Sequence, residues 1–343
     1  MINAADLAHC RAVIRTGSLS FHAASKLLPA QVRDPALALY AFCRLADDEV
    51  DEGGAKGQAV LDLQARLDAA YAGTPRNAPE DRAFAAIIEE FDMPRALPEA
   101  LLEGLAWDAV EREYDTLSQV RAYSARVAAA VGAMMCVLMR VRDADALARA
   151  CDLGVAMQLT NIARDVGEDA AMGRIYLPRD WLREAGIDPQ VFLDDPQATP
   201  DLRRLVRRLL AEARRLYIRS EAGIGQLPRA ARAGIFAARY IYAGIGDAVR
   251  RNAHDSISQR ARTSRAEKLL LLGTSGLRAT GTLLLPHSPV LFAPPLPETA
   301  YLVEAAAHAQ PRSGTGRMDG LMQILTELRA REMQRASSGV AAE

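Results

Sequence analysis

Two groups of acidic residues lie inside segments of the chain that are otherwise apolar. One group spans residues 47–52, with the sequence Asp-Asp-Glu-Val-Asp-Glu, and the other spans residues 165–169, with Asp-Val-Gly-Glu-Asp. A helix returns to the same face every three or four residues, so each group extends a polar stripe along its helix. The first stripe is Arg44, Asp47 and Asp51, and the second is Gln158, Asn161, Asp165 and Asp169.

Carboxylates placed this close together need a counter-charge. Two of them about 5.5 Å apart repel by roughly 3 kcal/mol at an effective dielectric of about 20, so they must be solvated, protonated or bridged by cations. Oxygen ligands favour Mg²⁺ or Mn²⁺, which fill their remaining positions with water and phosphate. Metal held on two facing helices would bind a diphosphate as a leaving group. Guanidinium groups suited to complete such a clamp are those of Arg44, Arg164, Arg174 and Arg260.

Each stripe also has a simpler interpretation. For residues 47–51 alone, a solvated helix end explains the acids as well as a metal site does, because acidic residues are common on surfaces. For residues 158–165 that interpretation is weaker, since a Gln/Asn/Asp stripe inside an apolar helix requires polar partners. The two stripes together favour a metal site.

The segments that must position these residues have helical patterns. Residues 36–46 are apolar almost all round, with Pro35 predicted at the first helical position and Gly53-Gly54 predicting the end. Residues 123–139 and 144–169 predict two further helices. In the second of these, an apolar stripe beside the polar one predicts that both faces are covered: Val155, Leu159, Ile162 and Val166.

The rest of the chain follows the same period. Helical patterns occur at about 58–72, 80–91, 97–113, 202–216, 229–251 and 320–335, and after Arg260, whereas residues 173–178 predict a loop. Ser18 or Ser20 is a predicted N-cap, and a helix N-terminus is a natural anion site. No segment shows sustained period-two alternation and no repeat occurs, so the prediction is an all-α protein.

Bulk composition excludes several classes. Lys+Arg total 42 and Asp+Glu total 43, for a net charge of −1, so nothing indicates a nucleic-acid partner. Four scattered cysteines without a CxxC pair indicate neither a zinc site nor a disulfide framework, and the N-terminus lacks a secretion signal, so we expect a reducing cytoplasm. The longest apolar run, residues 127–139, is shorter than the roughly 20 residues that span a bilayer.

Two stretches are candidates for peripheral membrane contact. The helix around residues 202–216 carries six arginines on its outer side; a solvated basic face is the favoured interpretation and a membrane-surface patch the alternative. The other candidate is the apolar stretch 283–296, which is interrupted by prolines.

The prolines also predict a division of the chain. We expect a helical domain, residues 1–281, and a proline-interrupted C-terminal extension with a final helix, residues 282–343.

Residues 41–52 and 158–169, followed by 173–178, closely resemble the squalene/phytoene synthases, and within that family most closely the bacterial phytoene synthases. The resemblance runs from about Ser18 to Lys268. It implies one helical bundle of the type I isoprenoid (terpenoid) synthase fold, with a central cavity flanked by two Asp-rich helices.

The resemblance also implies roles for individual residues. Mg²⁺ or Mn²⁺ would be bound by Asp47, Asp51, Asp165 and Asp169, with Asp48, Asn161 and Glu168 in support. The two diphosphates would be surrounded by Ser18, Ser20, Arg44, Gln158, Asn161, Arg164, Arg174, Tyr242 and Arg260. Tyr123 would orient the diphosphate or take a proton. Many relatives follow that tyrosine with a second aromatic residue and a glycine, where this chain has Ala125 and Ala129, and this departure leaves the proton acceptor open.

The implied reaction is the head-to-head condensation of two geranylgeranyl diphosphates to phytoene through prephytoene diphosphate, without NADPH. The alternative is a squalene or dehydrosqualene synthase acting on farnesyl diphosphate. The glycine pairs at 223–225 and 244–246 lack the third glycine of a dinucleotide fingerprint. A di-iron bundle would need Glu-x-x-His pairs, which this chain lacks. A non-catalytic assembly protein of the same fold is expected to lose acidic positions, and both Asp pairs are present. The oligomeric state stays open.

Overall fold

The computed structural model describes residues 1–52, 56–284, 286, 288–308, 324 and 326, without the side chains of residues 51 and 52. The ordered elements within these residues are helices, and no strand occurs among them, which confirms the all-α prediction. The predicted helix end at Gly53-Gly54 lies outside the described residues, as does the predicted last helix apart from residues 324 and 326.

The helices follow one another through short connections. Their bounds are α1 (Ala4–Gly17), α2 (Leu19–Ser25), α3 (Ala30–Glu52), α4 (Lys56–Tyr71), α5 (Pro79–Phe91), α6 (Ala96–Ala109), α7 (Leu117–Ser124), α8 (Ala130–Leu138), α9 (Ala144–Ala171), α10 (Arg179–Glu184), α11 (Pro189–Asp194), α12 (Pro200–Ile224), α13 (Arg229–Arg251), α14 (Arg265–Gly281) and α15 (Ala300–Ala307). A π-helix, η1 (Ala125–Ala129), joins α7 to α8, and two 3₁₀ turns, η2 (Pro289–Phe292) and η3 (Pro297–Thr299), precede α15.

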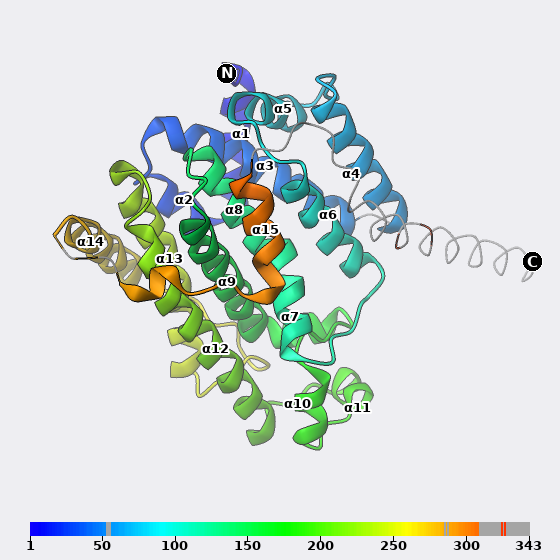
Figure 1. The fold of residues 1–343 in the computed structure, drawn as a ribbon. Helices are drawn as coiled ribbons and strands as arrows, with labels where there is room; N and C mark the ends of the chain where they lie inside the picture. Colours follow the sequence, from blue (N-terminus) through cyan, green and yellow to red (C-terminus); the bar gives the residue numbers. More distant parts are fainter. Residues whose placement is uncertain (53–55, 285, 287, 309–323, 325, 327–343) are drawn as a thin grey trace, which may run out of the picture.

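Helix α9 lies near the middle of the bundle, with α8, α12, α13 and α15 packed around it (Figure 1). It begins at Asp143, whose carboxylate accepts a hydrogen bond from the Ala146 N–H at 2.9 Å. The predicted apolar stripe of α9 is buried, the polar stripe is partly buried, and only Ala144, Glu168 and Ala171 of this helix are exposed. The prediction that both faces of this helix are covered is therefore confirmed.

Two predicted helix ends are wrong. Helix α3 begins at Ala30, five residues before the predicted start, so Pro35 lies inside the helix. Proline costs one intrahelical hydrogen bond there, but the residues that follow it, Leu37 to Phe42, are mostly buried and hold the helix in the core. The segment predicted to extend to residue 113 ends at Ala109, because Glu111 has a left-handed backbone with φ of 55°.

The segment Leu117–Leu138 is the one helical stretch of the described chain whose length and composition would suffice to cross a membrane, with a mean hydropathy of 1.2. More than half of its apolar window, 56%, is buried inside the protein. Because its partners are the neighbouring helices α6 and α9, this segment belongs to the core of the bundle.

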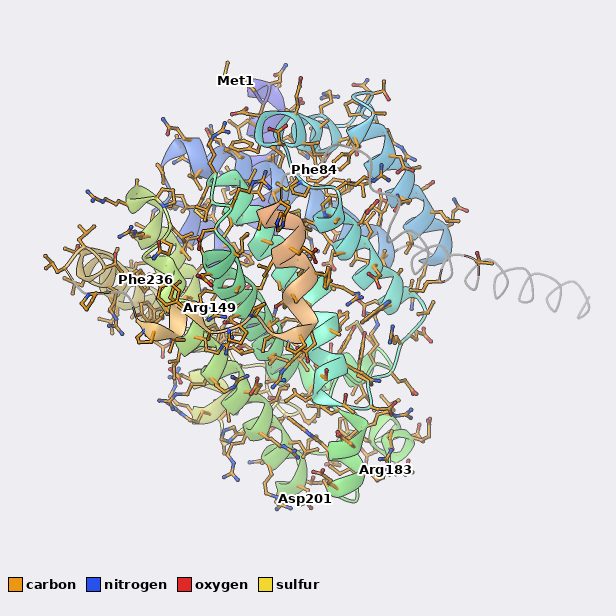
Figure 2. All side chains as sticks on the ribbon, in the orientation of Figure 1. Met1, Phe84, Arg149, Arg183, Asp201 and Phe236 are labelled. Atoms are coloured by element: carbon orange, nitrogen blue, oxygen red, sulfur yellow. The ribbon has the colours of Figure 1, made fainter. Side chains whose placement is uncertain are left out.

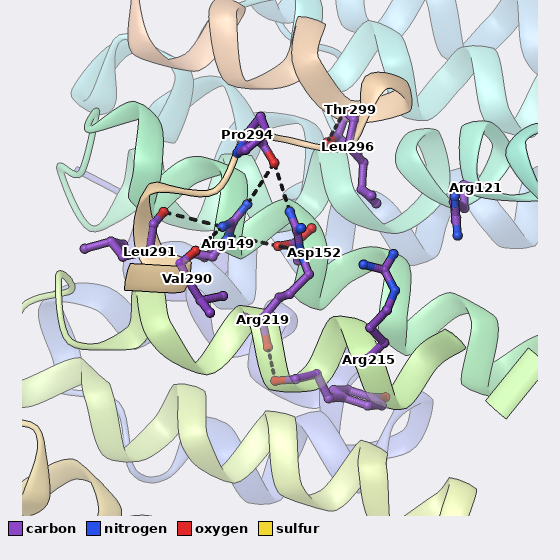
Figure 3. A network of polar contacts seen from close by, with 12 residues as sticks. Arg121, Arg149, Asp152, Arg215, Arg219, Val290, Leu291, Pro294, Leu296 and Thr299 are labelled. Carbon is purple, nitrogen blue, oxygen red and sulfur yellow. Dashed lines mark hydrogen bonds and ion pairs between the residues drawn. The ribbon is translucent and has the colours of Figure 1, made fainter. Parts of the chain in front are cut away.

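The chain after α14 returns to the bundle and is held by buried charge. Arg149 on α9 is 1% exposed and forms an ion pair with Asp152 at 2.8 Å, and Arg219 on α12 reaches the same carboxylate at 3.0 Å. Figure 3 shows both guanidiniums donating to backbone carbonyls of the returning segment, including Arg219 to Pro294 O at 2.9 Å. We call Arg149, Asp152 and Arg219 the anchor cluster.

The anchor cluster depends on a glycine. A Cβ at Gly223 on α12 would lie 2.4 Å from the Cβ of Arg149, so only glycine lets the arginine stem pass between the two helices. In Figure 2 Arg149 lies within the bundle, whereas Arg183 and Asp201 lie at its outer end. The division of the chain after residue 281 stays a prediction, although residues 289–307 pack onto the bundle.

Candidate functional site

The acidic stripe on α3 is exposed and pairs with its own helix. Arg44 forms ion pairs with Asp48 at 2.5 Å and with Asp47 at 3.5 Å, one turn further along. The Asp47 and Asp48 side chains are 50% and 39% exposed. Glu49 turns to the other side of the helix and pairs with Arg66 at 3.1 Å. The predicted ligand Asp51 lies in the last turn of α3, but its side chain lies outside the described part of the chain.

The acidic stripe on α9 is more deeply placed and more crowded. Arg164 donates from Nε to Asp165 Oδ1 at 2.6 Å, and Arg260, from the segment before α14, donates to the same oxygen at 2.9 Å. Arg260 also pairs with Glu168 at 3.1 Å. The Asp165 side chain is only 15% exposed. The structure thus brings together four residues that the sequence predicts for the site, and we call Asp165, Glu168 and Asp169 the acidic cluster.

Asp169 is the most perturbed carboxyl of the acidic cluster. Burial raises its pKa to about 8, and the negative charges of Asp165, Asp108 and Glu168 act in the same direction. Arg174, in the predicted loop after α9, opposes the shift with its positive charge. Around Asp169, acidic neighbours therefore outnumber cations, which is the condition under which a divalent cation stabilises a site.

The segment that carries Arg260 is fixed against α9 by its own hydrogen bonds. The Gly167 N–H donates to Ser256 O at 2.9 Å, and the Ser256 hydroxyl donates to Ala163 O at 2.6 Å. A Cβ at Gly167 would lie 2.9 Å from Ser256 O, so glycine between the two acids allows this approach. The Asp255 carboxylate accepts from the Ile257 and Ser258 N–H groups and pairs with Arg203. This turn sets where Arg260 meets Asp165.

Aromatic rings lie between the two acidic helices. Phe21 of α2 contacts Tyr40 of α3 and Tyr242 of α13, with ring centroids 6.2 and 5.1 Å apart. Burial raises the pKa of Tyr242, and the charges that act on it include those of Arg164 and Asp165. Tyr242 therefore lies near the acidic cluster, as predicted.

The amide and hydroxyl residues predicted for the site lie on its helices. Ser18 is the N-cap of α2, because its hydroxyl accepts from the Phe21 N–H at 3.2 Å, and Ser20 lies in the first turn of the same helix. On α9, the Asn161 amide donates to Gln158 Oε1 at 3.3 Å. This amide pair continues the polar stripe one turn before Asp165.

Asp108 is a site residue that sequence reasoning missed. Its two carboxylate oxygens accept from the hydroxyls of Tyr123 and Tyr176, each at 2.8 Å, and it acts electrostatically on Asp169. The two tyrosine rings are stacked with centroids 5.1 Å apart. Asp108 stands between Trp107 and Ala109, which are buried, on an apolar helix. The argument used for Asp165, that an acid on a buried helix requires partners, applies to Asp108 as well.

The small residues that follow Tyr123 lie in a buried π-helical turn. Ala125 and Ala129 bound the π-helix η1, and both are fully buried. A Cβ at Gly154 of α9 would lie 2.5 Å from Ala129 Cα and 2.7 Å from Ala128 O, so α9 contacts the widened turn directly. A side chain at position 154 would not fit at this contact. π-Helical turns often occur at functional sites, and here the turn lies directly after Tyr123.

The donor set fits Mg²⁺ or Mn²⁺. The candidate ligands are carboxylate and amide oxygens, and Asp169 lies in an excess of negative charge. Within the described residues, no three acidic, histidine or cysteine side chains lie close enough together to form a metal site as they stand. Asp48, Asp165 and Glu168 instead face arginines. Hollows of about 540 and 550 Å³ lie elsewhere, along α10 and α12.

Known proteins resemble this chain along most of its length. The family model described as squalene/phytoene synthase matches residues 14–267. A phytoene synthase of Cereibacter sphaeroides is 61% identical over 97% of this chain and 96% of its own length, and one of Rhodobacter capsulatus is 62% identical over 97% and 98%. A crystal structure of a dehydrosqualene synthase with ligand has a TM-score of 0.75 and 32% identity, covering 81% of this chain and 97% of that one.

Proposed function

This chain belongs to the squalene/phytoene synthase family, and from that membership we propose that it condenses two geranylgeranyl diphosphates head to head into phytoene. It is a prenyltransferase of carotenoid biosynthesis. The proposal rests on the sequence identity of 61–62% to two phytoene synthases over nearly the whole chain. The acidic cluster with its arginines supports it, since this chemistry requires the release of diphosphate.

Enzymes of this family act on prenyl diphosphates and generally use divalent metal ions. The residues we assign to the metal are oxygen ligands on the two acidic helices: Asp47, Asp48, Asp51, Asn161, Asp165, Glu168 and Asp169. When bound, Mg²⁺ or Mn²⁺ neutralises the diphosphate and stabilises it as a leaving group. The raised pKa of Asp169 supports this assignment, because a nearby divalent cation would favour the ionised carboxylate.

The arginines bind the diphosphates in this proposal. Arg44, Arg164 and Arg260 each pair with a carboxylate of the two stripes in the structure. Binding would exchange these partners, with carboxylates turning to metal and guanidiniums to phosphate oxygens, which they match in bidentate fashion. The predicted set is completed by Arg174, Ser18, Ser20, Gln158, Asn161 and Tyr242.

The reaction has two stages that use the same site. In the first, the C–O bond of one substrate breaks, the double bond of the other attacks the allylic cation, and loss of a proton closes the cyclopropane of prephytoene diphosphate. In the second, the remaining diphosphate leaves, the cation rearranges, and a second proton is lost. Two diphosphates and two protons are released, and no reductant is consumed. The buried apolar residues of α8 and α9 exclude the water that would trap the cations.

Tyr123 is the residue we assign to orienting a diphosphate or taking a proton. Asp108 fixes its hydroxyl, because the tyrosine donates its proton to that carboxylate at 2.8 Å. A proton taken up by the Tyr123 oxygen can therefore be passed on to Asp108. Tyr176 shares the same acceptor and holds the carboxylate from its other side.

Product analysis tests the proposed function. Purified protein with geranylgeranyl diphosphate and Mg²⁺ or Mn²⁺, without NADPH, is expected to yield a C40 hydrocarbon, measured in organic extracts. The competing substrate is farnesyl diphosphate, which a dehydrosqualene synthase would use. It is the second candidate because the sequence identity to such an enzyme is lower, at 32%. A C30 product alone, or product formed only with NADPH, would overturn the assignment. A cytoplasmic enzyme with peripheral membrane contact fits these apolar substrates.

A further inference from the structure

Exposed apolar side chains are concentrated on α14 and the residues after it. Of the thirteen large hydrophobic residues exposed in the described chain, seven lie between residues 269 and 292. Leu269, Leu270, Leu277 and Leu284 are 71%, 72%, 77% and 84% exposed. Because residues 270, 273, 277 and 284 recur at helical spacing, they share one face of α14 and its continuation. We call this the leucine face.

The leucine face points away from the rest of the molecule. Helix α14 lies at the edge of the bundle and packs against α13 (Figure 1). Its inner side carries the buried Ser275, and Leu271 lies 3.2 Å from where a Cβ of Gly244 on α13 would stand. On the outer side, a Cβ at Gly273 or Gly276 would meet no atom within 4 Å. One side of α14 is therefore packed, and the other has no partner within the described chain.

The unpaired charges beside the leucine face are positive. No acidic residue occurs between Lys268 and Pro297, but Lys268 lies on the side of the buried Ser275, and Arg278 pairs with Glu221 at 3.4 Å. Arg262 and Arg265 lie at the start of α14 and are exposed, and they form no ion pair among the described residues. The nearest acid on the helix, Glu267, already pairs with Arg251, and its carboxylate accepts a hydrogen bond from the Ser264 N–H. An apolar face bordered by cations is typical of a helix that lies on an anionic bilayer.

A second copy of the chain is the competing partner. In a symmetric dimer, the same patch meets itself, so Arg262 and Arg265 would face their own copies beside an apolar contact. Like charges in such a contact repel, and no acid between residues 268 and 297 offsets them. A lipid surface supplies both the apolar layer and the negative headgroups.

The leucine face adjoins the proposed site. Arg260, which contacts Asp165 and Glu168, lies five residues before the first residue of α14. Helix α13, on which α14 packs, carries Tyr242. A bilayer at α14 would therefore be close to the diphosphate end of the site, where prenyl chains dissolved in the membrane could enter. Entry of substrate from the membrane rests on the proposed function, whereas the binding of lipid to α14 does not.

We propose that the leucine face of α14, with the exposed Arg262 and Arg265 near its first turn, docks the protein on the surface of an anionic lipid bilayer.

Vesicle flotation tests the proposal. Full-length protein is mixed with phosphatidylcholine vesicles containing phosphatidylglycerol, and the molar partition coefficient is measured without substrate. The wild type is expected to bind, and a Leu270→Glu/Leu277→Glu variant is expected to lose at least tenfold in partition. Pure phosphatidylcholine vesicles, or 0.5 M salt, are expected to weaken wild-type binding severalfold, because the headgroup attraction is lost or screened.

A matched control uses exposed apolar residues elsewhere. Val191→Glu/Ile218→Glu changes two residues of similar exposure on α11 and α12 and is expected to leave the partition unchanged. Equal binding by the leucine-face variant, or no binding by the wild type, would overturn the proposal. So would a change from dimer to monomer in the variant with unchanged lipid binding, which would identify a second copy as the partner. Both variants are expected to retain activity on detergent-dispersed substrate, so loss of binding and loss of chemistry are distinguishable.

Discussion

Helix α9 carries charged side chains near both of its ends, and the two groups differ in how their charge is balanced. In the anchor cluster, Asp152 lies between two guanidiniums, whose remaining N–H groups donate to backbone carbonyls of residues 290–294. In the acidic cluster, Asp169 has three acidic neighbours and one cation. The carboxylate of the anchor cluster is paired with cations of the protein itself, whereas Asp169 in the acidic cluster has more acidic than basic neighbours, which raises its pKa.

The comparison separates a structural ion pair from a binding site made of the same residue types. Buried ion pairs contribute little net stability, but removing one partner is costly because the other charge stays buried. An acid excess costs stability in the free protein and is retained where it serves binding. Substitutions at the anchor cluster should therefore change stability, and substitutions at the acidic cluster should change activity.

The largest effect is expected at Asp165. Asp165→Asn keeps the shape of the side chain but removes the charge that we assign to the metal, so we expect activity to fall about 10³-fold. Steady-state rates with geranylgeranyl diphosphate would measure this, and the melting temperature should change by only a few degrees. Asp145→Asn, at the opposite end of the same helix, is the control and should keep its activity. Full activity of Asp165→Asn would remove the metal-clamp argument.

At the anchor cluster, Asp152→Ala is expected to act on stability. It leaves Arg149 buried without its carboxylate, which should lower the free energy of unfolding by about 3–5 kcal/mol. Denaturant unfolding would measure the loss, and activity per folded molecule should persist. The double variant Arg149→Met/Asp152→Leu should recover much of the stability, since it removes both fully buried charges and leaves only the partly exposed Arg219. A double variant as unstable as Asp152→Ala would contradict this account.

The pH dependence of stability should report the perturbed carboxyl of Asp169. In metal-free protein the pKa of Asp169 is raised to about 8, so the folded state holds a proton that the unfolded state has lost above about pH 4. The contribution of the Asp169 carboxyl to the free energy of unfolding is therefore complete below about pH 4. It decreases as the pH rises to about 8. The free energy of unfolding of Asp169→Asn minus that of the wild type should be larger at pH 8 than at pH 5. The expected increase in this difference is more than about 1 kcal/mol.

Thermal unfolding in EDTA at the two pH values measures this difference. Mg²⁺ with inorganic diphosphate should reduce the pH dependence of the wild type, because the metal would favour the ionised carboxylate. An identical pH profile for wild type and Asp169→Asn would show that burial does not perturb this group.

The smallest effect is expected in the tyrosine group beside the acidic cluster. Asp108→Asn weakens the acceptor of Tyr123 and Tyr176, and we expect about a tenfold lower kcat with little change in KM. Tyr123→Phe should cause a similar loss. Tyr114→Phe is a matched control, since its ring stacks in the same group but its buried hydroxyl has no hydrogen-bond partner among the described residues. Equal losses for Tyr114→Phe and Tyr123→Phe would indicate a packing role alone.

The sequence by itself determined the helical fold and both acidic stripes. Helical spacing is local, so residues 158–169 predict one polar face and one buried face without any knowledge of neighbours. The motifs also determined the family. The side chain of Asp51, one of the predicted ligands, lies outside the described residues, so its role stays a prediction.

Only the tertiary structure decided which distant residues meet. Asp108 and Tyr123 are on different helices, and their hydrogen bond depends on how α6 packs beside α7. The position of Pro35 inside α3 was decided by burial of the residues that follow it, which outweighs one lost hydrogen bond. The raised pKa of Asp169 likewise comes from neighbours on other elements. Desolvation and long-range charge depend on the packed arrangement, which the local pattern of residues does not contain.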